Sequence, residues 1–272
     1  MLSRLFASLA LTCGTASAAG VVFSSVVTTF DQGAPYNVAA SINGTAFDNL
    51  GWGVFGGQTS NQAAVYTAAA PFSGNMLSVF IPQFFGGNHY SQEFRISTTT
   101  DATPSLAGSW TEWAPPVARA TNGLSLTALG SNRFGVGGSS YNGQTGYHLM
   151  APGSFSGVTG VRLELLAGAG NLGAAPNGNL VISEFVVSTN ESVNLALGAP
   201  VTSSAPTWPG QPAFLLTDGV AGGASHPDQD AFAGFSYTVD LEGSYALTNL
   251  ELVNRGDGCC PDRLRNYRVE VL

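Results

Sequence analysis

Residues 235–241 read Phe235-Ser236-Tyr237-Thr238-Val239-Asp240-Leu241. Apolar and polar side chains alternate at every step, which is the period of a strand with one buried and one exposed face. Further segments read as strands: Val21–Phe30, Ala63–Tyr66, Met76–Ile81, Glu93–Thr98, Val158–Leu166, Leu180–Val187, Leu247–Val253 and Asn266–Leu272. The stretches between them are rich in Gly, Asn, Pro and Asp, which favour turns. Because no long amphipathic helix interrupts this pattern, the predicted fold class is all-β.

The composition agrees with a compact protein of short strands and tight turns. Of 272 residues, 44% are hydrophobic, only 10% are charged, and 35 are glycine. A chain this apolar and this poorly charged is not typical of a disordered protein. The nine basic residues are all arginine and face 17 acidic ones, which gives a formal net charge of −8. This balance disfavours non-specific binding to nucleic acid or to acidic membranes.

Residues 1–19 resemble a secretory signal peptide. Arg4 supplies the positive start, Leu5–Leu11 the apolar centre, and Ala16-Ser17-Ala18 a small-residue cleavage site. The apolar centre is too short to span a bilayer, and no later segment reaches that length, so we expect a secreted protein without a membrane span.

A break in the strand pattern near Ser188–Val193 predicts two domains, 20–189 and 190–272.

The C-terminal stretch concentrates positive charge and cysteine. It reads Asn254-Arg255-Gly256-Asp257-Gly258-Cys259-Cys260-Pro261-Asp262-Arg263-Leu264-Arg265-Asn266-Tyr267-Arg268. A surface loop with ion-paired arginines is the simplest interpretation, and a rigid loop that directs guanidinium groups at a polar ligand is the one we favour. Cys259 and Cys260 are the only cysteines left after loss of Cys13 with the signal peptide. A disulfide between these neighbours, two free thiols and a metal site are the alternatives, and export favours the disulfide.

Five ordered blocks in the second domain resemble the discoidin-like (coagulation-factor type C) and fucolectin, or F-type lectin, modules. They are Asn194–Thr202, Leu216-Thr217-Asp218-Gly219, Ser225-His226, Tyr237–Leu241 and the stretch from Asn254 to Leu264. In the first domain, Asp48–Val54, Phe84–His89, Phe94–Asp101 and Asn177–Phe185 are similar to bacterial galactose-binding-like modules. The resemblance implies two galactose-binding-like β-sandwich (jelly-roll) modules, the second of them incomplete.

The resemblance to F-type lectins also implies a sugar site. His226, Arg255 and Arg263 would hold a fucosylated or galactose-type glycan, and bridged Cys259 and Cys260 would stack on the sugar. Arginine and imidazole groups suit this role because they hydrogen-bond ring and hydroxyl oxygens. The family's structural Ca²⁺ would take Asp218 as one of its ligands.

Three departures from the lectin pattern affect these expectations. Gly258 is an extra residue before the cysteines, so Arg263 is displaced by one position. The loop before His226 is shorter than in the lectins. The sequence also ends at Leu272, before the remaining strands and C-terminal calcium ligands of a whole module, so we expect a fragment, a truncated product or a diverged half-domain.

The remaining candidate residues favour structural roles. His89 and His148 have no carboxylate or histidine at ligand spacing, so hydrogen-bonded loop histidines are expected. Trp110 and Trp113 either form a sugar-stacking platform or, as we favour, pack in the sandwich. No nucleophile, phosphate-loop or metalloprotease motif appears. We therefore predict a secreted, non-enzymatic, lectin-like or adhesion protein; the alternatives are the binding region of a larger exported enzyme such as a glycoside hydrolase, and a structural surface protein without ligand.

Overall fold

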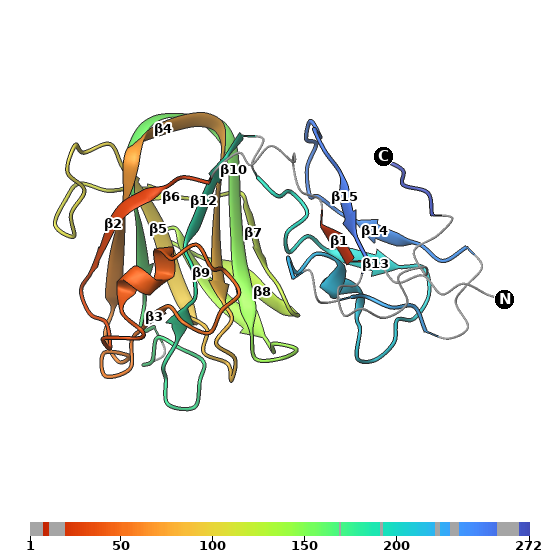
Figure 1. Cartoon of the computed structure of the whole chain (residues 1–272), viewed down its shortest axis with the longest axis horizontal. Coiled ribbons are helices and arrows are strands. Elements are labelled where there is room, and N and C mark those ends of the chain that lie inside the picture. Colours follow the sequence, from red (N-terminus) through yellow and green to blue (C-terminus); the bar gives the residue numbers. More distant parts are fainter. Residues whose placement is uncertain are drawn as a thin grey trace. The chain divides into compact units, whose positions relative to one another are not determined.

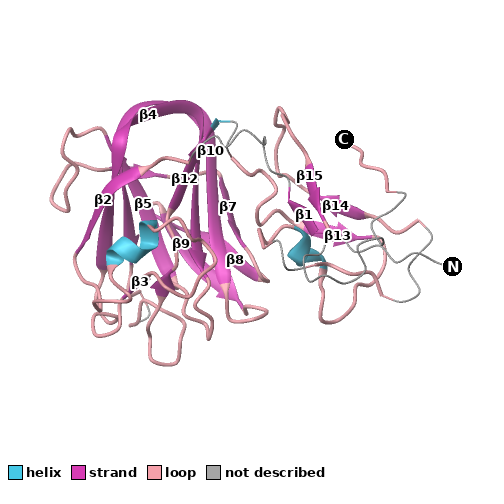
Figure 2. Ribbon diagram, in the orientation of Figure 1, coloured by secondary structure: helices cyan, strands magenta, loops and turns pink. Residues whose placement is uncertain are grey.

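The computed structural model describes residues 8–10, 20–168, 170–190, 193–220, 224–228, 234–254 and 267–272. The chain divides into two compact units, a larger one of Ser17–Val193 and a smaller one of Met1–Ala16 with Asn194–Leu272. Strands dominate the larger unit, the smaller unit has short strands, and the described helices are short 3-10 turns, η1 (Val38–Ile42) and η3 (Ala213–Leu216) (Figure 2). The predicted all-β class is confirmed.

The larger unit is an antiparallel β-sandwich (Figure 1). Its principal strands are β2 (Phe23–Thr28), β4 (Gln62–Gln83), β5 (Glu93–Thr99), β6 (Thr111–Trp113), β7 (Val117–Ala120), β8 (Leu124–Gly130), β9 (Arg133–Gly138), β10 (Thr145–Leu165) and β12 (Val186–Thr189). They pair in the order β12-β4-β10-β5-β9-β8, with β2 on β4, β6 on β5 and β7 on β10. A separate two-stranded ladder joins β3 (Trp52–Gly53) to β11 (Val181–Ile182).

Strands β4 and β10 are long and bent, and they run through both layers. Their ladder extends from Gln83↔Thr145 to Gln62↔Leu165, with register shifts between Pro152 and Gly160. β2 pairs with the start of β4 and β12 with its end, and both long strands turn over an arch at the top of Figure 1. The sequence predicted two separate strands within β4, Ala63–Tyr66 and Met76–Ile81, and only Val158–Leu166 within β10, because Pro and Gly residues read as breaks. In the structure these residues mark bulges that bend a continuous strand.

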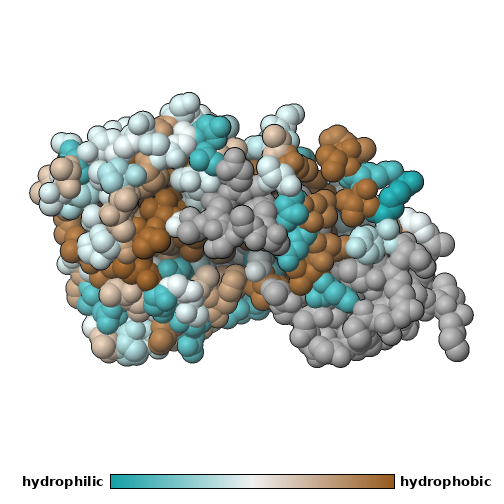
Figure 3. All heavy atoms as spheres, turned by 45° about the horizontal axis from the view of Figure 1, so that its top comes forward, coloured by the Kyte–Doolittle hydropathy of each residue, from teal (hydrophilic) through white to brown (hydrophobic). Residues whose placement is uncertain are grey.

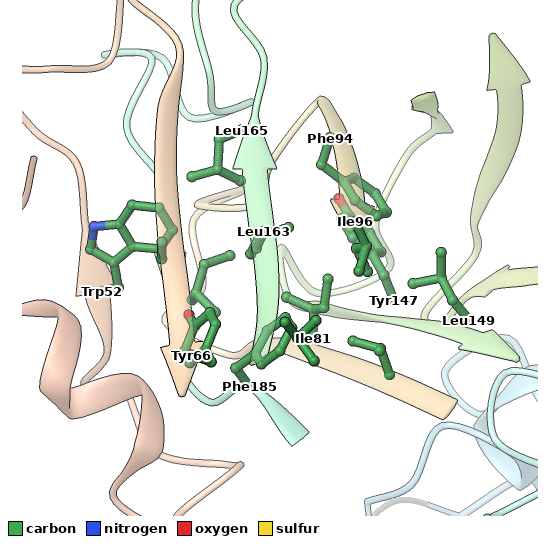
Figure 4. Close-up of a cluster of buried hydrophobic side chains, with 14 of the residues drawn as sticks. Trp52, Tyr66, Ile81, Phe94, Ile96, Tyr147, Leu149, Leu163, Leu165 and Phe185 are labelled. Carbon is green, nitrogen blue, oxygen red and sulfur yellow. The ribbon is translucent and has the colours of Figure 1, made fainter. Parts of the chain in front are cut away.

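The core lies between the two layers and is rich in aromatic rings (Figure 4). Tyr66 stacks on Phe185 with ring centroids 4.0 Å apart, and Phe94 stacks on Tyr147 at 5.1 Å. The polar atoms of the buried rings are satisfied, since Tyr147 Oη donates to the carbonyl of Ser91 (2.6 Å). This packing fixes the strands from whose ends the functional loops emerge.

The smaller unit has four short strands among its described residues. They are β1 (Ser8–Ala10), β13 (Val201–Ser203), β14 (Tyr237–Val239) and β15 (Glu251–Val253), paired as β1–β15 and β13–β14. The centre of the alternating stretch 235–241 thus forms a strand as predicted, whereas the predicted strand Asn266–Leu272 is wrong over Tyr267–Leu272. β1 falls inside the predicted signal peptide, so cleavage there would remove the partner of β15. A jelly-roll over 190–272 stays a prediction.

The visible surface of the larger unit carries many residues of intermediate hydropathy, drawn pale in Figure 3. This fits a chain in which only 10% of residues are charged. Within the described segments, no helix has the length and apolar character needed to cross a membrane.

Candidate functional site

Most of the sugar site expected from the F-type lectin resemblance lies outside the described residues. This holds for Arg255, Arg263, Cys259 and Cys260. Their contacts with a glycan and the bridge between the two cysteines therefore stay predictions.

His226 is described, and it is only 5% exposed. Its backbone N–H donates to Gln211, its carbonyl accepts from Trp208, and its Nδ1 contacts the carbonyl of Pro227. The imidazole lies 6.2 Å from the indole of Trp208, which is 42% exposed. The exposed group at this position is thus Trp208, which our sequence reasoning missed, and sugar binding by His226 stays a prediction.

Asp218, the expected calcium ligand, is 4% exposed. Its Oδ1 accepts the backbone N–H of Val220 at 2.8 Å. Burial raises the pKa of this carboxyl from its ordinary value of 3.8 to about 6. Among the described residues, no three His, Cys, Asp or Glu side chains are grouped to hold a metal ion. The role of Asp218 as a calcium ligand stays a prediction.

The two tryptophans of residues 110–113 are held by packing. Trp110 donates from Nε1 to the carbonyl of Ser105 (3.1 Å), and the Arg162 guanidinium lies 5.0 Å from the centre of its ring. Trp113 packs against the core. His148 is also buried, with Nε2 2.8 Å from Ser78 Oγ. Trp110 and Trp113 thus have the packing role that we favoured. His148 is hydrogen-bonded as expected, but it lies in strand β10 and not in a loop.

A different group of side chains gathers where β4 ends and β10 begins. We call it the loop surface, and it comprises Tyr36, Phe47, Phe85, His89, Tyr141 and Asn142. The loops that carry it lie at the lower end of the larger unit in Figure 1, away from the arch. Each of these loops contacts the segment Phe84–His89, which follows β4 directly. The sequence resemblance assigned this segment to a galactose-binding-like module, and the structure makes it a loop.

The ring of Phe85 is the centre of this surface. It contacts Tyr36 edge to face with centroids 5.7 Å apart, and His89 on another side at 4.6 Å. His89 Nδ1 lies 2.8 Å from the carbonyl of Gly86. A carbonyl can only accept, so Nδ1 carries the proton and Nε2 of the neutral ring is left as an acceptor. An aromatic ring and a hydrogen-bonding imidazole therefore stand side by side.

Further aromatic and amide groups extend the surface. Phe47, which is 50% exposed, contacts Phe84 edge to face at 4.9 Å. Tyr141 and Asn142 are exposed on the loop before β10. Gln144, from the same loop, donates from Nε2 to the carbonyl of Phe84 at 2.6 Å. These contacts tie the loop before β3 and the loop before β10 to the loop after β4.

The loop Phe84–His89 has a fixed backbone. Gly86, Gly87 and Asn88 all have positive φ angles, of 90°, 58° and 62°. The Asn88 N–H donates to the carbonyl of Gly143 (3.0 Å), and a Cβ at Gly143 would lie 2.9 Å from the backbone nitrogen of Gly87. Only glycine permits this close approach of two backbones. The rings of the loop surface are therefore held on a rigid frame.

The segment Asn179–Phe185 ties these loops together from beneath. Asn179 Oδ1 accepts the N–H of Val54 (3.2 Å), and the N–H of Val181 donates to the carbonyl of His89 (3.1 Å). Ser183 Oγ accepts the N–H of Phe84 at 2.9 Å, and Glu184 binds the loop of residues 43–45. The sequence predicted one strand, Leu180–Val187. The structure instead has β11 and β12 with Ser183–Phe185 between them. The side chains of Ser183 and Glu184 in this interruption hydrogen-bond the loops.

Carboxylates in the larger unit are engaged in structural contacts. Glu93, Glu112 and Glu164 pair with arginines. Asp31, Asp48, Asp101 and Glu184 accept backbone N–H groups. Hydrolysis of a glycosidic bond by two carboxyl groups requires a pair directed at the substrate. The described carboxylates of the larger unit are directed at the protein itself.

The chain was compared with known proteins. No family model matches it, and no curated protein matches it. Among solved structures, it is similar to a family 32 carbohydrate-binding module of Streptococcus pneumoniae EndoD (TM-score 0.41, 10% identity, 63% of this chain and 100% of that one). It is also similar to the family 32 module of Clostridium perfringens NanJ, solved in complex with galactose (TM-score 0.38, 12% identity, 62% and 98%). A third, also from C. perfringens, is a family 32 module in complex with GalNAc-β-1,3-galactose (TM-score 0.38, 12% identity, 61% and 94%).

Proposed function

We propose that this chain is an exported, non-enzymatic carbohydrate-binding protein, and that its larger unit binds a glycan through the loop surface. The observation that carries the proposal is the ring of Phe85, held between Tyr36 and His89 on a rigid loop. A sugar has apolar C–H faces and a rim of hydroxyl groups. Aromatic rings pack against the first, and imidazole and amide groups hydrogen-bond the second.

Binding without catalysis fits the state of the carboxylates. The described acidic residues of the larger unit are bound to arginines or backbone amides, as set out above. The alternative of a binding region within a larger exported enzyme makes the same prediction for this chain, namely glycan binding without hydrolysis. A structural protein without ligand makes the opposite one.

The test is a glycan-binding titration of the full chain with galactose, N-acetylgalactosamine, fucose and oligosaccharides that contain them. Phe85→Ala should weaken binding about ten-fold, which corresponds to roughly 1.4 kcal/mol and to the loss of one aromatic contact. Phe155→Ala is the matched control, since it removes a similar edge-to-face pair, with Phe72 at 6.0 Å, at the arch.

Unchanged glycan affinity of a folded Phe85→Ala protein would contradict glycan binding at the loop surface. Absence of binding by the wild-type chain to every glycan tested would favour the structural protein without ligand.

A further inference from the structure

The loop that carries Phe47 begins with a short backbone motif suited to anions. Asn43 has φ −85° and ψ −4°, in the right-handed region, and Gly44 follows with φ +82°. Successive residues in this right-then-left order turn their backbone N–H groups into one concavity, called a nest, that binds anions. Glycine is suited to the second position because a side chain is strained at positive φ.

An anion of the protein itself lies in this nest. The N–H groups of Gly44 and Thr45 donate to the same carboxylate oxygen, Glu184 Oε2, at 3.1 and 3.3 Å. Burial raises the pKa of Glu184, and the N–H groups of Thr45, Gly44 and Asn43 act in the opposite direction. Glu184 is separated from the nest by about 140 residues of sequence, so this contact fixes the loop to the rest of the unit.

The nest is connected to Phe47 through the rest of its loop. Asn43 Oδ1 accepts the N–H of Thr45 (2.7 Å), and Asn43 Nδ2 donates to Asp48 Oδ2 (3.3 Å). Asp48 Oδ1 in turn accepts the N–H of Leu50 at 3.1 Å. Both ends of the segment that contains Phe47 are thereby tied, and the nest is its anchor to the sandwich.

We propose that Glu184 is a positioning residue, whose carboxylate fills the Asn43–Thr45 nest and so holds Phe47 in place on the loop surface. The effect on ligand binding rests on the proposed glycan-binding function, whereas the closure of the loop does not. In the structure, the partner of the carboxylate is the backbone of the loop.

The experiment is a chemical rescue. Glu184→Ala empties the nest, and hydrogen exchange of the Gly44 amide in the full chain should accelerate at least ten-fold. The Thr45 amide should accelerate less, because it keeps its 2.7 Å bond to Asn43 Oδ1. Added sodium acetate should restore their protection, because a free carboxylate can occupy the vacated nest. Sodium chloride at the same ionic strength is the control and should restore much less. Glu184→Gln keeps an acceptor oxygen and should retain most of the protection.

Two results would overturn the proposal. One is unchanged exchange of both amides in Glu184→Ala. The other is stabilisation of the wild type by added calcium chloride that Glu184→Gln abolishes, since a cation would then be the partner of the carboxylate. If Glu184→Ala does not fold, Glu184→Gln decides the question: loss of protection there contradicts a nest that needs only an acceptor oxygen.

Glycan titration of the same variants separates this inference from the proposed function. If both hold, Glu184→Ala should weaken glycan binding at least five-fold, and acetate should restore it. If the wild type binds no glycan while acetate still restores the protection of the amides, the proposed function is contradicted and the role of Glu184 in the nest is supported. If glycan binds but Glu184→Ala is as tight as wild type, Glu184 does not position the binding loop.

Discussion

Single carboxylates in this chain differ in what surrounds them. Glu164 receives two hydrogen bonds from Arg95, from Nε at 2.7 Å and Nη2 at 3.0 Å. Asp218 is buried and accepts the backbone N–H of Val220, and its burial raises the pKa of its carboxyl to about 6. A raised pKa means that the folded state holds its proton more tightly than the unfolded chain does.

The sign of this shift predicts how stability depends on pH. Between about pH 4 and 6, the folded protein binds more protons at Asp218 than the unfolded chain does. The contribution of Asp218 to stability is therefore present below its ordinary pKa, and it is lost as the pH rises through 6. Asp218→Asn keeps an oxygen that accepts the N–H of Val220, and its free energy of unfolding should depend less on pH. At neutral pH, the resulting change should be on the order of 1–3 kcal/mol. Thermal unfolding of both proteins across this range is the measurement. Parallel curves would show that Asp218 titrates normally.

Strands β5, β6, β9 and β10 present a charged face opposite the core. Arg95 joins Glu112 and Glu164, Arg162 joins Glu164 at 3.1 Å, and Arg133 joins Glu93 at 2.8 Å. In a chain with so few charges, this network concentrates ion pairs on one sheet face. Arg95 is its centre, because it bridges β10 and β6 across β5.

Removal of Arg95 should therefore cost more than removal of a peripheral arginine. Arg95→Ala is expected to lower the free energy of unfolding by about 1–2 kcal/mol, because Glu164 is largely buried and loses both bonds to Arg95. Arg133→Ala, whose side chain is 40% exposed, should cost less than half of that. Denaturant unfolding of the two variants compares them directly. Equal losses would mean that the network adds nothing beyond its separate pairs.

The strand elements show what can be predicted from the residues. β5 follows the expected Glu93–Thr98 almost residue for residue, since its alternation is regular. β4 was expected in two pieces and β10 only over its second half, because Pro71 and Gly153 look like strand ends and only tertiary packing turns them into bends. The sequence resemblance included the segment Phe84–His89, but its loop conformation depends on contacts with Gly143 and Ser183, which lie far away in sequence.

On the scale of the whole chain, the two units differ in how they are built. The larger unit has the bent strands β4 and β10 and a closed aromatic core. The described strands of the smaller unit are three residues each and pair two by two. Short two-stranded ladders are marginal in water unless packing supports them.

Limited proteolysis should reflect this difference. We expect first cleavage after about residue 190 and a resistant fragment that corresponds to the larger unit. Mass spectrometry of the time course identifies the fragment. Equal resistance of both units would show that the smaller one is stabilised by more than its short ladders.

The central claim is that the loop surface binds a glycan. The most direct measurement is a titration of the isotope-labelled full chain with galactose, N-acetylgalactosamine and fucose, followed through backbone amide chemical shifts. The account predicts saturable shifts at Tyr36, at residues 44–48 and 84–89, and at Tyr141 and Asn142. Shifts confined to the surroundings of Trp208 and His226, or no shifts with any of the sugars, would contradict it.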